Sequence, residues 1–305
     1  MNEKINFEEK IETKEKLKEK PALTMYLLRH GQSEKDKTQI KRGLTEKGQK
    51  QVTETMQNVI KNLIQENNSN FNQWDDNDKI QEEVQKITDK TEFHLRDSGT
   101  ERTIQQVWLE YDILKKYGIA DQNIFLPKAV LEYKDQKSDQ AGPGIAKRLK
   151  GVQGVDENPN FRLKLRDPEY RKKVKATGDL MAWVKTPENE IPAGIEKLSE
   201  MKTRYTKDIN KAERVIKHLV ENYEKKVIVI ANSHASIATL AAAEEESMLI
   251  PKSDNLKEIL NEVGEMPEAQ GLKYDFYKGD KKHEARVFGK DIEEGISRID
   301  ARQIG

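Results

Sequence analysis

The sequence predicts an α/β fold, a three-layer sandwich with a mostly parallel central sheet. Short apolar runs typical of buried strands alternate along the chain with longer segments whose apolar residues recur at helical spacing. Hydrophobic residues make up 35% of the chain and gather in these segments, whereas a disordered chain would dilute them. With 305 residues the chain can also bury a sizeable core.

The first predicted unit is a strand, a loop and a helix. Residues 22–28 form a short apolar run that fits a buried strand. In the following helical segment, 43–66, Thr45 is a plausible N-cap. Six apolar residues of this segment share one helical face: Val52, Met56, Val59, Ile60, Leu63 and Ile64. Residues 66–80 are polar and rich in Asn and Asp, which predicts a surface loop.

The same order of elements then recurs along the chain. Residues 91–95 and 123–133 are the second and third predicted strands, and the loop and helix between them end at Gly118. Later elements are a helix over 203–226, the most strand-like run over 227–231, a loop and helix over 232–245, and a hairpin over 272–288 that turns around Gly279 and Asp280.

The predicted domain organisation is simple. Residues 1–22 form a charged N-terminal arm with no candidate chemistry, and residues 23–305 form one domain. From about 137 to 200 the sequence is charged and interrupted by Gly and Pro, which indicates a charged helical insertion over the sheet.

Composition excludes several classes of protein. Lys plus Arg equals Asp plus Glu at 54 each, so the overall basic field used for nonspecific nucleic-acid or membrane binding is missing. Without cysteine there is no disulfide framework, no thiolate nucleophile and no cysteine-based zinc site. The first twenty residues lack the apolar core of a signal peptide, and no run reaches the ~20 apolar residues of a membrane span. We therefore expect a cytoplasmic protein.

The polar residues that follow the predicted strands are the candidate site. Ligands of open α/β sheets bind beyond the carboxyl ends of the strands, so side chains placed there should converge. They are Arg29, His30 and Gly31 after the first strand, Arg102 after the second, Glu132 near the end of the third, and His234 after the run 227–231.

This set of residues fits a phosphate ligand. The guanidinium groups of Arg29 and Arg102 match phosphate oxygens bidentately. Gly31 lets the backbone approach an anion, and the amides at the start of the next helix favour one. A neutral imidazole aligned with phosphorus can attack it, which predicts His30 as a nucleophile.

Five segments, "LLRHG", "LTEKG", "SGTERTIQQ", "VLEY" and "VIVIANSHAS", together resemble the histidine phosphatase superfamily, which has the phosphoglycerate mutase-like fold, and more closely its branch of small phosphatases. The resemblance implies a phosphohistidine on His30, phosphate-clamping arginines at Arg29 and Arg102, a second histidine at His234, and a proton-donating acid at Glu132. It implies no metal and no cofactor. Lys35 to Lys37 stand where the family commonly has Asn, and Ala235 replaces the usual glycine.

The resemblance implies hydrolysis of phosphate monoesters, with a small phosphorylated metabolite or a phosphorylated protein as substrate, and no nucleic acid or membrane partner. The segment after Glu132 does not resemble that of the phosphoglycerate mutases, which favours a phosphatase over a mutase. A mutase-type phosphotransferase and a non-catalytic phospho-ligand or protein-binding member remain alternatives. The sequence carries no signal for oligomeric state.

Several residues near the site stay open at this point. Asp135 or Asp97 could serve as the acid in place of Glu132, and Gln32 and Ser33 could touch the phosphate. The remaining histidines read as structural or exposed: His94 on a strand, His218 on a helix and His283 in the hairpin.

Overall fold

A computed structural model describes residues 20–34, 43–127, 130–131, 158–176, 178–234, 266–278 and 283–289. Within these ranges one sheet of six strands forms the centre, in the order β3-β2-β4-β1-β5-β6. The strands are β1 (Leu23–Arg29), β2 (Thr91–Arg96), β3 (Ile124–Phe125), β4 (Lys226–Ser233), β5 (Gly271–Phe276) and β6 (His283–Phe288).

The sheet is mostly parallel, as predicted. The pairs β1–β4, β4–β2 and β2–β3 are all parallel. The strand β5 is antiparallel to β1, and β6 is antiparallel to β5, so β6 runs in the same direction as β1. The carboxyl ends of β1, β2 and β4 therefore meet at one edge of the sheet, which we call the carboxyl edge, and their first residues meet at the opposite, amino edge.

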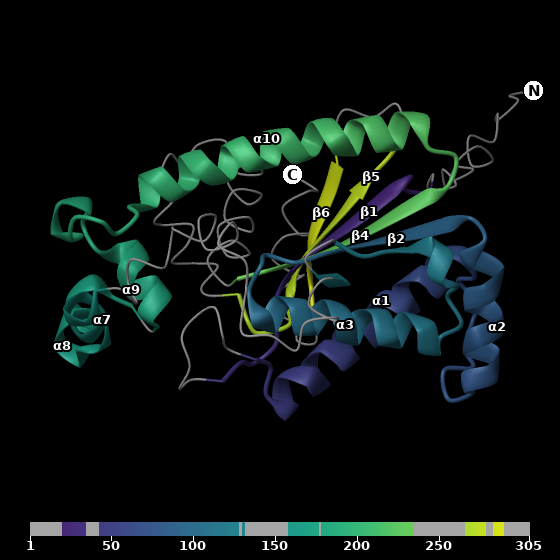
Figure 1. Ribbon diagram of the computed structural model, residues 1–305, viewed down its shortest axis with the longest axis horizontal. Coiled ribbons are helices and arrows are strands. Elements are labelled where there is room, and N and C mark those ends of the chain that lie inside the picture. Colours follow the sequence, from purple (N-terminus) through teal and green to yellow (C-terminus); the bar gives the residue numbers. More distant parts are fainter. Residues whose placement is uncertain are drawn as a thin grey trace, which may run out of the picture.

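Helices cover both faces of the sheet (Figure 1). On one face lie α1 (Glu46–Asn67), α2 (Asn77–Thr88) and α3 (Glu101–Lys116), and on the other α10 (Leu198–Asn222). To the side of the sheet, near the start of α10, lie α7 (Pro159–Arg166), α8 (Pro168–Val174) and α9 (Asp179–Lys185). The alternation of side chains along β1 serves both layers: Tyr26 and Leu28 belong to the apolar cluster with α1 and α3, and Leu27 belongs to the cluster that includes β5, the start of α10 and α7–α9. Two short 3₁₀ turns, η1 (Asp121–Asn123) and η2 (Glu188–Glu190), complete the elements.

The helix α1 forms for the reasons seen in the sequence. The Thr45 side chain accepts a hydrogen bond from the Gly48 amide at 3.1 Å, which caps the first turn. All six apolar residues of the predicted face are buried. The helix α3 ends at Lys116, and Gly118, two residues later, has a φ of +87°, which suits a residue without a side chain.

The helix α2 corrects the loop predicted over 66–80. Glu66 and Asn67 belong to the last turn of α1, and residues 68–76 are outside regular structure. Asp76 accepts hydrogen bonds from the Asp78 and Lys79 amides and starts a helix there. Its buried side is narrow: Ile80, Val84, Ile87 and Thr88. Polar residues dominate this stretch of sequence, so the few apolar residues at helical spacing did not predict a helix.

The third predicted strand, 123–133, is also corrected. Among the described residues of this run, paired structure is confined to Ile124 and Phe125, and Val130 and Leu131 are helical. Pro127 has no N–H to continue the ladder, and its carbonyl accepts from the Val130 amide at 3.0 Å, which turns the chain.

Two of the later elements agree with the sequence, whereas the helix predicted within 232–245 lies outside the described residues from residue 235 on. The helix α10 begins five residues before the predicted 203 and ends at Asn222, and β5 pairs with β6 as a hairpin. The turn at Gly279 and Asp280 lies outside the described residues, as do residues 1–19 of the N-terminal arm and the part of the expected insertion before residue 158. In the described part of the chain, every helix is too short or too polar to cross a membrane.

Candidate active site

Four of the predicted side chains meet at the carboxyl edge. Because β1 and β4 are parallel neighbours, Arg29 lies opposite Ser233, and the His30 amide donates to the Ser233 carbonyl at 3.0 Å. The rings of His30 and His234 are then 5.3 Å apart between centroids. Arg102, in the first turn of α3, donates from Nη2 to His234 Nδ1 at 3.1 Å.

A backbone carbonyl sets the tautomer of His30. Its Nδ1 lies 2.7 Å from the Gly31 carbonyl oxygen, which can only accept a hydrogen bond, so Nδ1 carries the proton. In the neutral ring the lone pair therefore sits on Nε2. The side chain is buried, with 8% of its surface exposed, and an imidazole held in this way is oriented for attack through Nε2.

The tautomer of His234 is the opposite one. A guanidinium only donates, so Nδ1 of His234 accepts from Arg102 and Nε2 carries the proton, 3.0 Å from the Ser98 hydroxyl. Burial lowers the pKa of His234 well below its ordinary value of 6.5, and the positive charge of Arg102 adds to this effect. His30 and Arg29 act in the same direction.

This arrangement makes His234 a neutral N–H donor. Its Nε2 holds no lone pair with which to accept a proton from Ser98, so the Ser98–His234 contact does not form the nucleophile and base of a serine hydrolase.

The two arginines are held from different elements. Arg29, at the end of β1, donates to the carbonyl of Met266 in the segment that leads into β5. Arg102 is 5% exposed and lies inside the cluster, unlike an arginine on a solvated helix surface.

Gly31 has a packing reason to be glycine. A Cβ at this position would lie 2.5 Å from the Gly48 carbonyl oxygen, because the loop after β1 packs directly against the first turn of α1. Gln32 lies in the same contact: its amide donates to Gln51 Oε1 at 2.9 Å and its side chain accepts from the Thr45 hydroxyl at 3.1 Å. Phosphate binding by Gly31, Gln32 or Ser33 stays a prediction.

Of the three candidate acids, the structure describes one. Glu132 and Asp135 lie outside the described residues. Asp97 follows β2, and its Oδ1 accepts from the Gly99 amide at 2.6 Å. Burial raises the pKa of Asp97, outweighing hydrogen bonds from the backbone that lower it. This carboxyl therefore favours its protonated form more than an exposed aspartate does.

Three buried polar residues beneath the site did not stand out in the sequence. Gln106 and Glu110 follow Arg102 at helical spacings of four and eight, and Asn232 precedes His234 by two positions on a strand. Those spacings place them on the same faces as the predicted site residues, which is the signal that could have found them. From the sequence alone, Gln106 and Glu110 would be taken for residues on the solvent-exposed face of a helix, whereas both are buried.

The other histidines lie elsewhere. His94 stacks on Phe125 with ring centroids 4.6 Å apart, and burial lowers its pKa. His218 is exposed on α10 next to Asn222, and His283 opens β6. Among the residues that the structure describes, no three His, Asp or Glu side chains are grouped closely enough to hold a metal ion.

Comparisons with known proteins find only distant likenesses. Neither a protein-family model nor a curated protein matches the chain. A solved structure described as mycobacterial hydrolase 1 is 13% identical with a TM-score of 0.40, covering 88% of this chain and 98% of that one. The native structure of mycobacterial glucosyl-3-phosphoglycerate phosphatase, also 13% identical, has a TM-score of 0.40 and covers 87% of this chain and 98% of that one. Its complex with inorganic phosphate has a TM-score of 0.37 at 13% identity and covers 88% of this chain and 97% of that one. At this similarity the comparisons carry no argument about activity.

Proposed function

We propose that this protein is a phosphatase of the histidine phosphatase type, with a phosphoglycerate mutase-like fold, that hydrolyses phosphate monoesters through a phosphohistidine on His30. The observation that carries the proposal is the meeting of His30, Arg102 and His234 at the carboxyl edge, with the His30 lone pair on Nε2. The substrate is a small phosphorylated metabolite or a phosphorylated protein.

In the first step, Nε2 of His30 attacks phosphorus and the bond to the ester oxygen breaks. The departing oxygen takes its proton from an acid. The sequence favours Glu132 as this acid, and Asp97, whose pKa is raised by burial, is the alternative among the described residues. Arg29, Arg102 and the Nε2–H of His234 stabilise the charge on the transferring phosphoryl group. The phosphorylated ring keeps its Nδ1–H on the Gly31 carbonyl, which stabilises the positive charge that develops on the imidazole.

In the second step, water attacks the phosphorus of the phosphohistidine. The carboxylate left by the acid takes a proton from this water, the N–P bond breaks, and its electron pair returns to His30 Nε2. Inorganic phosphate leaves, and both the acid and the imidazole regain their starting forms.

Rapid-quench labelling with a phosphorus-labelled ester tests the proposal. A phosphoramidate is labile in acid and stable in base, unlike a serine ester, so the parent protein should show that signature and His30→Ala should lose the label. His218→Ala is the matched control, because this histidine is exposed on α10 and should label like the parent. Label that persists in His30→Ala would overturn the assignment. A steady-state assay then separates hydrolysis from isomerisation and from binding alone.

A further inference from the structure

A triad of fully buried polar side chains, Gln106, Glu110 and Asn232, lies beneath the candidate site. Their exposed fractions are 1%, 0% and 3%. Gln106 and Glu110 lie one turn apart on α3, and Asn232 reaches them from β4. The mechanism above does not use any of them, and a buried carboxyl without a function costs stability.

The hydrogen bonds of the triad have one consistent direction. The Gly31 amide donates to Gln106 Oε1 at 3.1 Å, and since a backbone N–H only donates, this contact fixes which way the Gln106 amide points. Its Nε2 then donates to Asn232 Oδ1 at 2.6 Å and to Glu110 Oε1 at 3.0 Å.

The orientation of Asn232 follows from the same logic. Its Oδ1 accepts from Gln106, so its Nδ2 faces Glu110 and donates to Oε2 at 2.8 Å. Glu110 thus accepts at both oxygens, from two donors that cannot turn without breaking another bond. A carboxylate satisfies both donors, whereas an amide at this position would set N–H against N–H.

We propose that Glu110 is a positioning residue: through Gln106 it fixes the peptide between His30 and Gly31, and thereby the orientation of the His30 imidazole for attack. The link to the ring is the bond from His30 Nδ1 to the Gly31 carbonyl oxygen, which lies in the next peptide group and is joined to the anchored one through the Gly31 Cα. The kinetic part of this inference rests on the proposed phosphatase function.

A second glutamine holds the other side of the same glycine. Gln51, on α1, accepts from the Gln32 amide at 2.9 Å, so both peptide groups that flank Gly31 are anchored from helices. Orientation of this kind matters because a misplacement of ~1 Å at a reacting group can cost about 10²-fold in rate.

The buried carboxyl also has an electrostatic cost. Burial raises the pKa of Glu110 to about 8, although the hydrogen bonds from Asn232 and Gln106 lower it. The ionised carboxylate, which accepts from both donors, is therefore the main form only above about pH 8, and the tests below are made at such a pH. A residue that only filled space could be apolar and avoid this desolvation. The geometry instead uses the one side chain that can accept from both donors.

The first test is a pair of isosteric variants. Glu110→Gln should slow the single-turnover phosphorylation of His30 by a factor on the order of 10². The affinity for inorganic phosphate should stay within about twofold, because Arg29 and Arg102 remain. The double variant Glu110→Gln with Asn232→Asp exchanges carboxylate and amide, restores an acceptor to every donor, and should recover most of the rate.

Glu82→Gln, at an exposed position of α2, is the matched control and should behave like the parent. A parental rate in Glu110→Gln, or a folded double variant no faster than the single one, would overturn the proposal. Should Glu110→Gln fail to fold, Gln106→Met keeps a side chain of similar size that cannot accept from Gly31, and it should show the same loss of rate.

Amide hydrogen exchange separates this inference from the proposed function. Exchange of the Gly31 amide should be faster in Glu110→Gln and return to the parental rate in the double variant. If the parent forms no phosphohistidine, the phosphatase proposal fails, but the exchange measurement still decides whether the triad holds the loop. Unchanged exchange at Gly31 would rule out the positioning role.

Discussion

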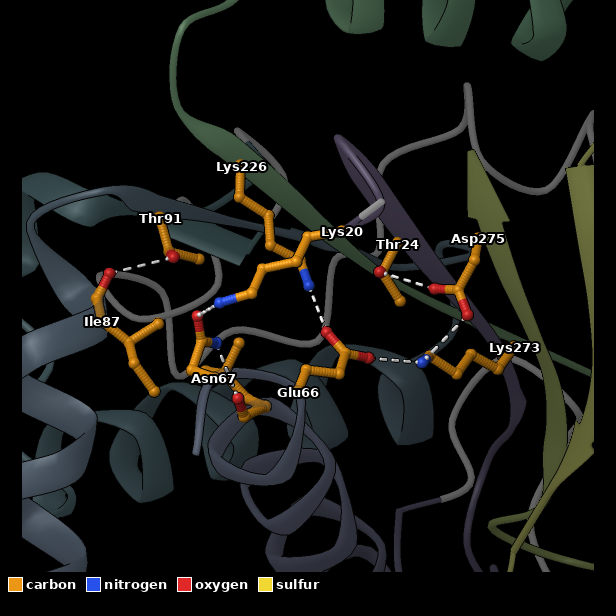
Figure 2. A network of polar contacts seen from close by, with 10 residues as sticks. Lys20, Thr24, Glu66, Asn67, Ile87, Thr91, Lys226, Lys273 and Asp275 are labelled. Atoms are coloured by element: carbon orange, nitrogen blue, oxygen red, sulfur yellow. Dashed lines mark hydrogen bonds and ion pairs between the residues drawn. The ribbon is translucent and has the colours of Figure 1, made fainter. Parts of the chain in front are cut away.

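The amino edge and the carboxyl edge of the central sheet both bury charged side chains, but with different partners. At the amino edge, shown in Figure 2, Glu66 at the end of α1 pairs with Lys226 and with Lys273, the latter at 2.6 Å. Lys273 also lies 3.0 Å from Asp275, whose other oxygen accepts from Thr24 at 2.8 Å. At the carboxyl edge, Arg29 and Arg102 each make a hydrogen bond to a neutral acceptor, a carbonyl oxygen for Arg29 and an imidazole nitrogen for Arg102.

The pKa values of the two edges differ accordingly. Burial acts to raise the pKa of Glu66, but the attraction of Lys226 and Lys273 outweighs it, and the net shift is downward. At the carboxyl edge burial raises the pKa of Asp97, and positive charges add to the effect of burial in lowering that of His234. At the amino edge, opposite charges compensate one another, which is typical of a structural role. At the carboxyl edge, positive charges and a carboxyl that favours its protonated form are typical of a site that binds an anionic ester.

The largest expected effect would identify the acid of the carboxyl edge. Glu132→Ala should lose a factor of roughly 10² to 10⁴ on an alkyl phosphate, because an alkoxide needs a proton to leave, and considerably less on p-nitrophenyl phosphate. Asp97→Asn, measured in parallel on both esters, is the comparison. Equal losses of Glu132→Ala on the two substrates would mean that it does not donate the proton. A leaving-group dependence in Asp97→Asn would then transfer the role to Asp97.

The second prediction concerns the amino edge. Lys273 is 1% exposed, and Lys273→Met leaves Glu66 and Asp275 without one of their counter-ions. The free energy of unfolding in urea should fall by roughly 3 to 5 kcal/mol, while kcat/KM of the folded protein stays within twofold of the parent. Lys79→Met removes an exposed pair with Glu82 and should change neither quantity. A large loss of kcat/KM in folded Lys273→Met would break the distinction between the two edges.

Arg102→Lys is expected to have the reverse pattern. An ammonium cannot make two parallel hydrogen bonds to one phosphate, so kcat/KM should fall on the order of 10²-fold, or about 2.7 kcal/mol, with little change in the urea midpoint. The matched control is Arg96→Lys, at an exposed position at the end of β2, which should keep parental kinetics. If Arg102→Lys stays within twofold of the parent, Arg102 does not clamp the phosphate.

The smallest expected effect is a pH dependence of stability. Because burial and neighbouring positive charge depress the pKa of His234 below 6.5, the unfolded chain binds a proton there that the native chain does not. The free energy of unfolding should therefore fall as the pH drops below about 6.5, by at most ~1.4 kcal/mol per pH unit. In His234→Asn, whose Oδ1 can still accept from Arg102, this part of the fall should disappear.

Urea unfolding of both proteins between about pH 5.5 and 7.5 measures the difference, in which other titrating groups cancel. Added inorganic phosphate should reduce the fall in the parent, because a bound anion raises the pKa of His234. The prediction would be wrong if the free energy of unfolding depended on pH in the same way in the parent and in His234→Asn.

Much of the fold follows from local patterns in the sequence. The six apolar residues of α1, its Thr45 cap and the stop of α3 at Gly118 are all found where the sequence predicts them. The same is true of the meeting of Arg29, His30, Arg102 and His234, because parallel neighbours bring their carboxyl ends to one edge. Failures came where the local pattern was weak, as in the polar helix α2, or where Pro127 ended the third strand after two residues.

The sequence by itself determined which residues could do chemistry, since residue type and spacing decide which side chains share a face or a strand end. Tertiary structure alone decided their chemical state. The lone pair of His30 lies on Nε2 because of the Gly31 carbonyl, and that of His234 on Nδ1 because of Arg102. Glu110 joined the site because β4 brings Asn232 against α3. Tautomer, pKa and hydrogen-bond direction depend on atoms from distant segments, so these properties exist only once the chain has folded.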